Sequence, residues 1–227
     1  MLHTEFPRLW GDIGQDRGFC CQMERYYVTG ANSKSVVLSD CDLCDEFVSG
    51  ALQLQENGCD VITTSCGFLV KYQRQIADRL RVPFVSSSLL IYSFLKEINS
   101  KDSFVGILTA NRERLMNLGY RPVDVDAAEE MNVAGMEDTY FYKVYVENAI
   151  TEEKDLDKER LYKNLLEKAW MLKNKRPGLR CVLLECTNMS PFKARLKEDI
   201  GVEVYDLSSV IELCCGFQIT ESRSHTV

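Results

Sequence analysis

The stretch Asp60-Val61-Ile62-Thr63-Thr64-Ser65-Cys66-Gly67-Phe68-Leu69 decides the fold of this chain. A β-branched run that ends in small polar residues, followed at once by an amphipathic segment, predicts a buried strand, a tight turn and a helix start. Cys66 then lies at the carboxyl end of the strand, where open α/β sheets bind ligands. The N–H groups and dipole of the following helix favour a thiolate there. We therefore expect Cys66 to take part in chemistry.

The pattern occurs a second time, in Cys181-Val182-Leu183-Leu184-Glu185-Cys186-Thr187-Asn188-Met189. Each block continues through a predicted helix and strand to a pair of serines. Ser86 follows Cys66 by 20 residues, and Ser208 follows Cys186 by 22 residues. These offsets are typical of a duplicated strand-helix-strand unit. One such cysteine could be an ordinary buried thiol, but two in matched positions favour a functional role.

The whole chain alternates strands with helices, which predicts an α/β fold with mainly parallel sheets. Strands are expected over residues 26–28, 36–38, 61–66, 82–85, 104–110, 181–184 and 202–207. Helices are expected over residues 42–57, 69–80, 89–98, 112–118, 152–173 and 191–199. Residues 122–132 are expected to form a strand and loop, and the tail from residue 220 to be loose.

A pseudo-two-fold relation between the halves would bring the two cysteines to opposite walls of one cleft. We therefore expect two lobes related by this symmetry, each a mainly parallel sheet flanked by helices, with the active site in the interlobe cleft. Residues 1–98 with 205–227 would make lobe one, which holds Cys66. Residues 99–204 would make lobe two, which holds Cys186.

The composition of the chain limits the kinds of partner that it can bind. The 227 residues have a formal net charge of −7, which argues against nucleic-acid binding because phosphate recognition needs clustered Lys and Arg. No apolar run reaches the roughly 20 residues of a membrane span. The first residues have no basic or apolar region typical of a secretion signal. We expect a cytoplasmic protein that acts on a small carboxylate substrate.

The ten cysteines are expected to be reduced thiols in that compartment. Cys41 and Cys44 form a CxxC motif that fits half a zinc site or a redox pair. We favour a plain helix turn, because no second CxxC or histidine pair completes the ligand set. The two histidines, His3 and His225, lie near the ends of the sequence, which argues against a Cys–His catalytic pair. No metal site is predicted.

Two opposed thiols suit proton transfer at a carbon next to a carboxylate, one removing the proton and the other returning it on the opposite face. The enediolate formed needs hydrogen bonds to its oxygens. The hydroxyl, amide and backbone N–H groups that flank the cysteines can supply them, from Thr64, Ser65, Gly67, Thr187 and Asn188. Neither a GxGxxG nor a GxxxxGK[ST] motif occurs, and no cofactor is expected.

The motifs Thr63-Thr64-Ser65-Cys66-Gly67-Phe68 and Glu185-Cys186-Thr187-Asn188 resemble the paired cysteine motifs of the aspartate/glutamate racemase superfamily. Hydantoin racemases, maleate isomerases and arylmalonate decarboxylases are members. The loop Gly11-Asp12-Ile13-Gly14 and the Cys-Gly-Phe step also resemble the algal dimethylsulfoniopropionate lyases of this superfamily. The resemblance implies two lobes, catalysis without pyridoxal phosphate, and a homodimer. It makes Cys66 and Cys186 the opposed acid and base, with the five flanking residues as a carboxylate shell and Asp12 and Thr109 at its border.

Three functions stay open from the sequence. The first hypothesis is a cofactor-independent racemase or epimerase that uses both cysteines at the carbon α to a carboxylate. The second is a lyase that shares the proton abstraction and then expels a β-leaving group or carbon dioxide. The third is a small-acid binding protein without catalysis. A racemase needs both thiols, whereas a one-base lyase could survive the loss of one, and a binding protein would tolerate serine at either position.

Overall fold

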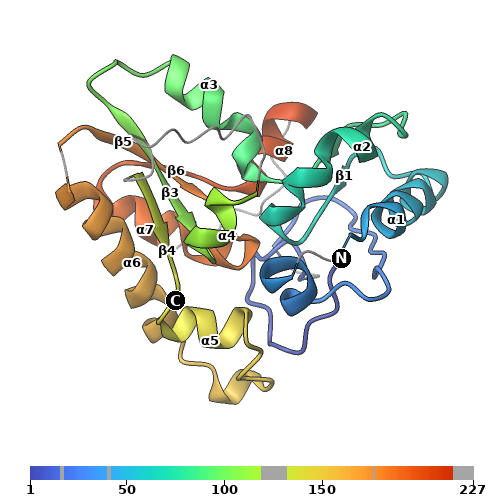
Figure 1. Ribbon diagram of the computed structural model, residues 1–227, viewed down its shortest axis with the longest axis horizontal. Helices are drawn as coiled ribbons and strands as arrows, with labels where there is room; N and C mark the ends of the chain where they lie inside the picture. The colour runs from blue at the N-terminus through green and yellow to red at the C-terminus, as the bar shows by residue number, and fades with distance from the viewer. Residues whose placement is uncertain (16–17, 40–41, 119–131, 176, 217–227) are drawn as a thin grey trace.

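Two parallel sheets form the framework of the computed structural model, which describes residues 1–15, 18–39, 42–118, 132–175 and 177–216. The smaller sheet pairs β1 (Ile62–Thr63) with β2 (Phe84–Val85). The larger sheet has the order β4-β3-β5-β6. Its strands are β3 (Phe104–Thr109), β4 (Val133–Gly135), β5 (Leu179–Leu184) and β6 (Glu203–Tyr205), all paired in parallel. The predicted α/β fold with parallel sheets is confirmed (Figure 1).

The larger sheet is buried on both faces, which explains the continuous apolar runs of β3 and β5. Because successive side chains alternate between faces, Val105 and Ile107 join one hydrophobic core, and Phe104 and Leu108 join another. Strand β5 divides in the same way, with Cys181 and Leu183 in the first core and Val182 and Leu184 in the second. The sheet is therefore the layer between two cores.

Helices cover both faces. On one face α6 (Lys158–Lys175) packs against β3, β4 and β5, and its neighbours are α5 (Tyr140–Tyr145) and α7 (Lys193–Ile200). On the other, α3 (Tyr92–Glu97) packs on β3, and α8 (Leu207–Cys215) on β2 and β6. The small sheet contacts α1 (Cys44–Glu56) and α2 (Gln73–Ala77), opposite the larger sheet in Figure 1. The short helix α4 (Arg112–Met116) packs on β4.

The two cysteine blocks have the same local order. Cys66 is the N-cap of a 3₁₀ helix, η2 (Gly67–Tyr72), which runs into α2 and then β2. Cys186 is the N-cap of a second 3₁₀ helix, η7 (Thr187–Phe192), which runs into α7 and then β6. Both cysteines have extended backbone conformations. The repeated unit is thus present, while the pseudo-two-fold axis and the lobe boundaries at 98/99 and 204/205 stay predictions.

Several local predictions were wrong. Residues 36–38 are not a strand but part of a π-helical turn, η1 (Lys34–Leu38). The cause lies just upstream, where the Asn32 side chain accepts from the Ser35 N–H at 2.9 Å and the Ser35 hydroxyl accepts from the Asn32 N–H at 2.9 Å. Such reciprocal side-chain bonds start a helical turn. Residues 26–28 also form no strand, and α5 and α8 were not predicted.

Other predicted segments fall partly outside the described residues, namely residues 122–131, the tail from residue 220 and Cys41. Cys44, its partner in the CxxC motif, is the first residue of α1. Two further 3₁₀ turns, η3 (Ser88–Ile91) and η6 (Glu153–Asp155), precede α3 and α6.

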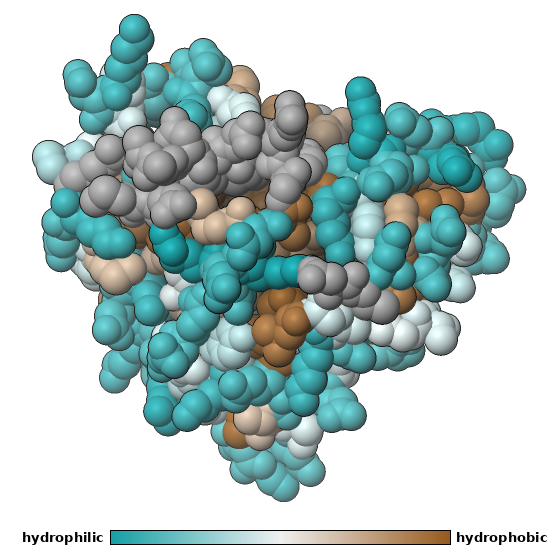
Figure 2. Space-filling model, viewed as in Figure 1, coloured by the Kyte–Doolittle hydropathy of each residue, from teal (hydrophilic) through white to brown (hydrophobic). Residues whose placement is uncertain are grey.

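Hydrophilic side chains cover most of the face in Figure 2, and apolar ones show in small areas. Within the described ranges, no helix combines the length and the apolar character needed to cross a bilayer.

Candidate active site

One small cavity is lined by both Cys66 and Cys186, at the ends of the two repeated units. Its wall continues with Phe6 and Arg8 from the N-terminal segment and Tyr145 from α5. The cavity volume is about 20 Å³, room for roughly one water molecule. Binding of a substrate therefore requires side chains of the wall to move.

Hydrogen bonds hold the two cysteine loops together. The Thr187 hydroxyl donates to the Ser65 carbonyl at 2.9 Å, across 122 residues of sequence. The Thr64 hydroxyl donates to the Ser86 carbonyl at 2.8 Å, and the Ser88 hydroxyl donates to the Leu184 carbonyl at 2.6 Å. These hydroxyls are buried, so each satisfies a carbonyl that has no access to water. The loops are fixed relative to one another by these contacts.

The pKa values of both thiols are raised above their usual range, which corrects the prediction that a helix N-terminus lowers them. Burial raises the pKa of Cys66 to about 12, and the nearby Glu185 carboxylate raises it further. The pKa of Cys186 is raised well above its usual value by burial, by Glu185 and by Cys66. Backbone N–H groups at the helix starts lower the pKa of each thiol, as predicted, but burial raises it by more. Desolvation dominates because both sulfur atoms are enclosed.

Glu185 lies deep in the same site and is 1% exposed. Its Oε2 accepts from the Thr109 hydroxyl at 2.8 Å and from the Ala110 N–H at 3.2 Å. Its Oε1 is buried and has no hydrogen-bond partner among the described residues. Burial raises the pKa of Glu185 to about 7. The carboxyl group therefore holds its proton to a higher pH than an exposed glutamate does.

Gly67 lets Glu185 approach the first cysteine loop. A Cβ atom on Gly67 would lie 2.3 Å from the Glu185 carbonyl oxygen and 2.4 Å from its Oε1. Both distances are far below a van der Waals contact, so a side chain here would push the two cysteine blocks apart. The absence of a side chain at residue 67 is a packing requirement of the site.

Arg8 is the cation at the cavity wall. Its Nη1 donates to Asp12 Oδ1 at 2.7 Å and lies 3.5 Å from the Asn188 Oδ1. Its Nη2 donates to the Thr4 hydroxyl at 3.3 Å. The Arg8 side chain is only 10% exposed. A guanidinium held in this way can offer N–H groups to a carboxylate that enters the cavity.

The predicted site residues fall into two groups. Four of them line the cavity, namely Cys66, Cys186, Ser65 and Asn188. The other five hold the lining residues in place: Thr64 and Thr187 through carbonyls, Thr109 and Gly67 through Glu185, and Asp12 through Arg8. Asn188 also approaches the Cys186 sulfur, with its Nδ2 at 3.5 Å. Hydrogen bonding thus accounts for residues that the motif alone placed in a substrate shell.

Sequence reasoning missed Arg8, Glu185 and Tyr145. Glu185 stands directly before Cys186 in the second motif, and a carboxylate at the end of an apolar strand was a usable signal. Arg8 precedes Asp12 by four residues in a loop already suspected of bordering a pocket. Tyr145 gave no signal, because α5 was not predicted. Its ring packs edge-on against Phe6, with the centroids 4.9 Å apart.

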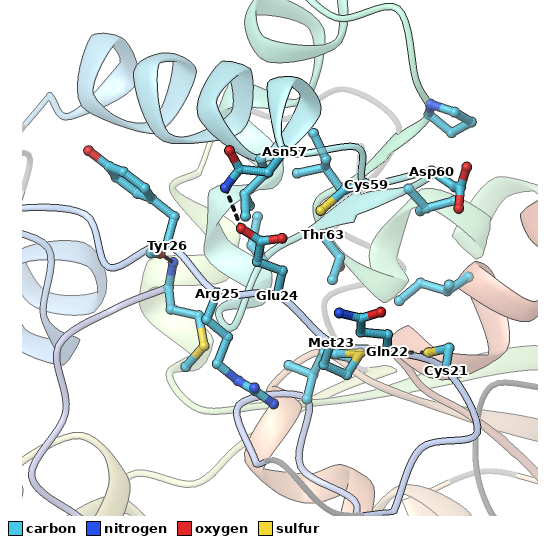
Figure 3. A pocket seen from close by; sticks show the side chains of 18 of the residues that line it. Cys21, Gln22, Met23, Glu24, Arg25, Tyr26, Asn57, Cys59, Asp60 and Thr63 are labelled. Atoms are coloured by element: carbon cyan, nitrogen blue, oxygen red, sulfur yellow. Dashed lines mark hydrogen bonds between the residues drawn. The ribbon is translucent and has the colours of Figure 1, made fainter.

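A second and larger cavity, of about 530 Å³, lies beside β1 and the segment of residues 21–26. Figure 3 shows Glu24 hydrogen-bonded to Asn57 on one side of it. Ser65 lines both cavities, but neither Cys66 nor Cys186 lines the larger one. The two cysteines predicted from the sequence therefore line the small cavity and not the larger one. In the described ranges, no cluster of three or more His, Cys, Asp or Glu side chains could hold a metal ion.

Curated proteins similar to this chain include dimethylsulfoniopropionate lyases. The lyase from Durusdinium sp. clade D is 28% identical over 156 residues, which cover 67% of this chain and 50% of that protein. Lyase 6 from Emiliania huxleyi (strain CCMP1516) is 24% identical over 227 residues, 95% of this chain and 56% of that protein. The predicted resemblance is confirmed. The chain spans about half the length of these two relatives.

No family model matches the chain. Among solved structures, allantoin racemase from Klebsiella pneumoniae superposes with a TM-score of 0.48 at 13% identity, covering 81% of this chain and 75% of that one. Arylmalonate decarboxylase superposes with a TM-score of 0.45 at 14% identity, covering 72% of this chain and 70% of that one. Both TM-scores lie below 0.5.

Proposed function

We propose that this chain is a cofactor-independent lyase that removes a proton α to a carboxylate and expels a β-substituent, as in the cleavage of dimethylsulfoniopropionate. The observation that supports this most is the meeting of Cys66 and Cys186 on one buried cavity beside Arg8. The sequence similarity to dimethylsulfoniopropionate lyases, at 28% and 24% identity, favours elimination over the racemisation first expected.

The proposed roles follow from charge and position. Arg8, with Asn188 beside it, would bind the substrate carboxylate and stabilise the negative charge that develops on it as the α-proton leaves. One cavity thiol would act as the base. Because burial raises the pKa of Cys66 to about 12, the thiolate must form after a substrate enters. The positively charged β-substituent of the substrate favours that ionisation by Coulomb attraction.

The step balances without a further reactant. The thiolate takes the α-proton, the electron pair of the C–H bond forms the C=C bond, and the C–S bond breaks with its electron pair going to sulfur. The products are acrylate and dimethyl sulfide, and the cysteine returns its proton to solvent. The net reaction converts the zwitterion into acrylate, dimethyl sulfide and one proton.

The test is an NMR assay of the chain in deuterium oxide with dimethylsulfoniopropionate, L- and D-aspartate, and L- and D-glutamate. We expect acrylate and dimethyl sulfide from the first substrate, with loss of product in Cys66→Ser or Cys186→Ser. Cys20→Ser, at an exposed cysteine, is the matched control. Neither product nor α-deuterium on any compound, or full activity in both cavity variants, would contradict the proposal.

A racemase is the second candidate, and the specific observation in its favour is that two thiols, not one, line the cavity. In the same assay it predicts α-deuterium with inversion on an amino acid, lost in both serine variants. A binding protein without catalysis predicts that a substrate binds equally well to all three proteins and is released unchanged.

A further inference from the structure

We propose that Glu185 is the counter-ion of the substrate, and that its carboxylate selects a positively charged group on the β-carbon over a neutral one of the same shape. The inference rests on the proposed function, because it concerns substrate choice at that site. It assigns a specificity-determining role to a residue outside the two cysteines and the carboxylate-binding groups.

The first support is the unequal use of the two carboxylate oxygens. Oε2 is fixed by Thr109 and by the Ala110 N–H. Oε1 is buried without a hydrogen-bond partner in the part of the chain that the structure describes. Buried polar atoms are almost always satisfied, since an unpaired one costs roughly 1–3 kcal/mol. Glu185 lines the cavity, so a ligand bound there can pair with this unused acceptor.

The second support is the need for a carboxylate at all. A neutral glutamine could accept the same two hydrogen bonds from Thr109 and Ala110 through one oxygen, without the desolvation cost of a buried charge. Residue 67 is a glycine, and the absence of a side chain there makes room for Glu185. A carboxyl group buried at this cost beside two thiols is better explained by a positively charged ligand, which favours its ionised form, than by packing.

The third support is the cavity wall. Phe68 and Tyr145 line the same cavity as Glu185, whereas the Phe6 ring in that wall faces the Arg8 guanidinium, 5.1 Å from its centroid. Aromatic faces attract cations, including sulfonium and quaternary ammonium groups that cannot donate hydrogen bonds. A zwitterionic substrate would then have an opposite charge for each end, with Arg8 for its carboxylate and Glu185 with the aromatic rings for its cation.

The charged and titratable neighbours of Glu185 are consistent with this assignment. Cys66 and Cys186 line the same cavity as Glu185, and the negative charge of Glu185 raises the pKa of both. A cation bound in this cavity would offset that charge. By contrast, an uncharged β-substituent would leave Glu185 unpaired beside the reacting carbon. The carboxylate therefore penalises neutral substrates as well as favouring charged ones.

The experiment compares two probes of equal shape, 3-(trimethylammonio)propionate and its carbon isostere 4,4-dimethylpentanoate. Dissociation constants are measured by calorimetry for the wild type, Glu185→Gln, Glu185→Asp and the control Glu137→Gln. Glu137 is a useful match because it also accepts a backbone N–H, from Arg112, but does not line the cavity. We expect the wild type and Glu137→Gln to prefer the cation by about tenfold or more.

Glu185→Gln should lose at least about tenfold in affinity for the cation, with affinity for the neutral probe unchanged. Glu185→Asp, which keeps the charge, should retain part of the preference. An equal change for both probes in Glu185→Gln, or no preference in the wild type, would overturn the proposal. If the preference depends on Glu185 but no acrylate ever forms, the assignment stands and the lyase proposal fails. If acrylate forms and Glu185→Gln binds both probes as the wild type does, the lyase proposal stands and the assignment of Glu185 fails.

Discussion

The Thr187 hydroxyl and the Ser65 carbonyl, 2.9 Å apart, join the two cysteine loops of the site. Both residues are buried, so Thr187→Val leaves the carbonyl without this donor. We expect Thr187→Val to lower the free energy of unfolding by about 1–3 kcal/mol. Thr187→Ser keeps the hydroxyl and should cost less. If urea unfolding showed that Thr187→Ser costs as much as Thr187→Val, the hydrogen bond would not be the main contribution of this side chain.

The buried thiols should be slow to react. With a pKa of about 12, roughly one Cys66 side chain in 10⁴ is ionised at pH 8, and only the thiolate is alkylated. We expect iodoacetamide to modify the exposed Cys20 and Cys214 at least about a hundredfold faster than Cys66. Mass spectrometry of peptides after timed labelling measures this. Equal labelling rates at pH 8 would contradict the burial and the pKa direction described for the site.

Arg8 and Asp12 form a buried ion pair, and Asp12 is 1% exposed. Removing only the cation leaves an uncompensated charge, so Arg8→Met should cost about 3–5 kcal/mol of stability. Adding Asp12→Asn in the same chain should recover part of that loss, because the asparagine oxygen still accepts the Gly14 N–H. Urea unfolding of both single variants and the double variant measures the coupling. Simple addition of the two single effects would show that the pair is not coupled.

Glu185 should make stability depend on pH. Its pKa is about 7 in the folded chain, against an ordinary value of 4.5. The folded state therefore binds the proton more tightly, so this contribution to stability is complete below pH 4.5 and is lost as the pH rises through 7. Between pH 4 and pH 8 the wild type should lose roughly 3 kcal/mol relative to Glu185→Gln. A constant difference between the two proteins in urea unfolding across this range would contradict the assigned shift.

Sequence pattern predicted the framework well, because it depends on local and repeated features. The apolar runs before Cys66 and Cys186 and the alternation of strands with helices are enough for parallel sheets buried on both faces. The 3₁₀ helices η2 and η7 could not be predicted from the apolar pattern. A six-residue segment spans only about two turns of a 3₁₀ helix, and apolar spacing over so few residues does not separate it from an α-helix.

The candidate site was harder to predict, because its chemistry depends on burial and on distant contacts. Whether Cys66 is a thiolate depends on desolvation and on Glu185, which lies 119 positions further along the chain. Arg8 reaches the site only because the N-terminal loop folds against Asn188. Thr109 looked like a ligand-binding hydroxyl at a strand end, but its hydrogen bond goes to Glu185. The residue types predicted a set of candidates, and the structure shows which of them line the cavity and which hold its wall.

The central claim is that a cavity thiol removes the α-proton, and the most direct test is the kcat/KM for α-deuterated and ordinary dimethylsulfoniopropionate in the wild type, Cys66→Ser and Cys186→Ser. The account predicts a primary isotope effect in the wild type. It also predicts a loss of about 10² to 10⁴ in kcat/KM when the cysteine that acts as base becomes serine. Both serine variants keeping the wild-type kcat/KM within a factor of about two would contradict it, since general-base catalysis is worth far more than that.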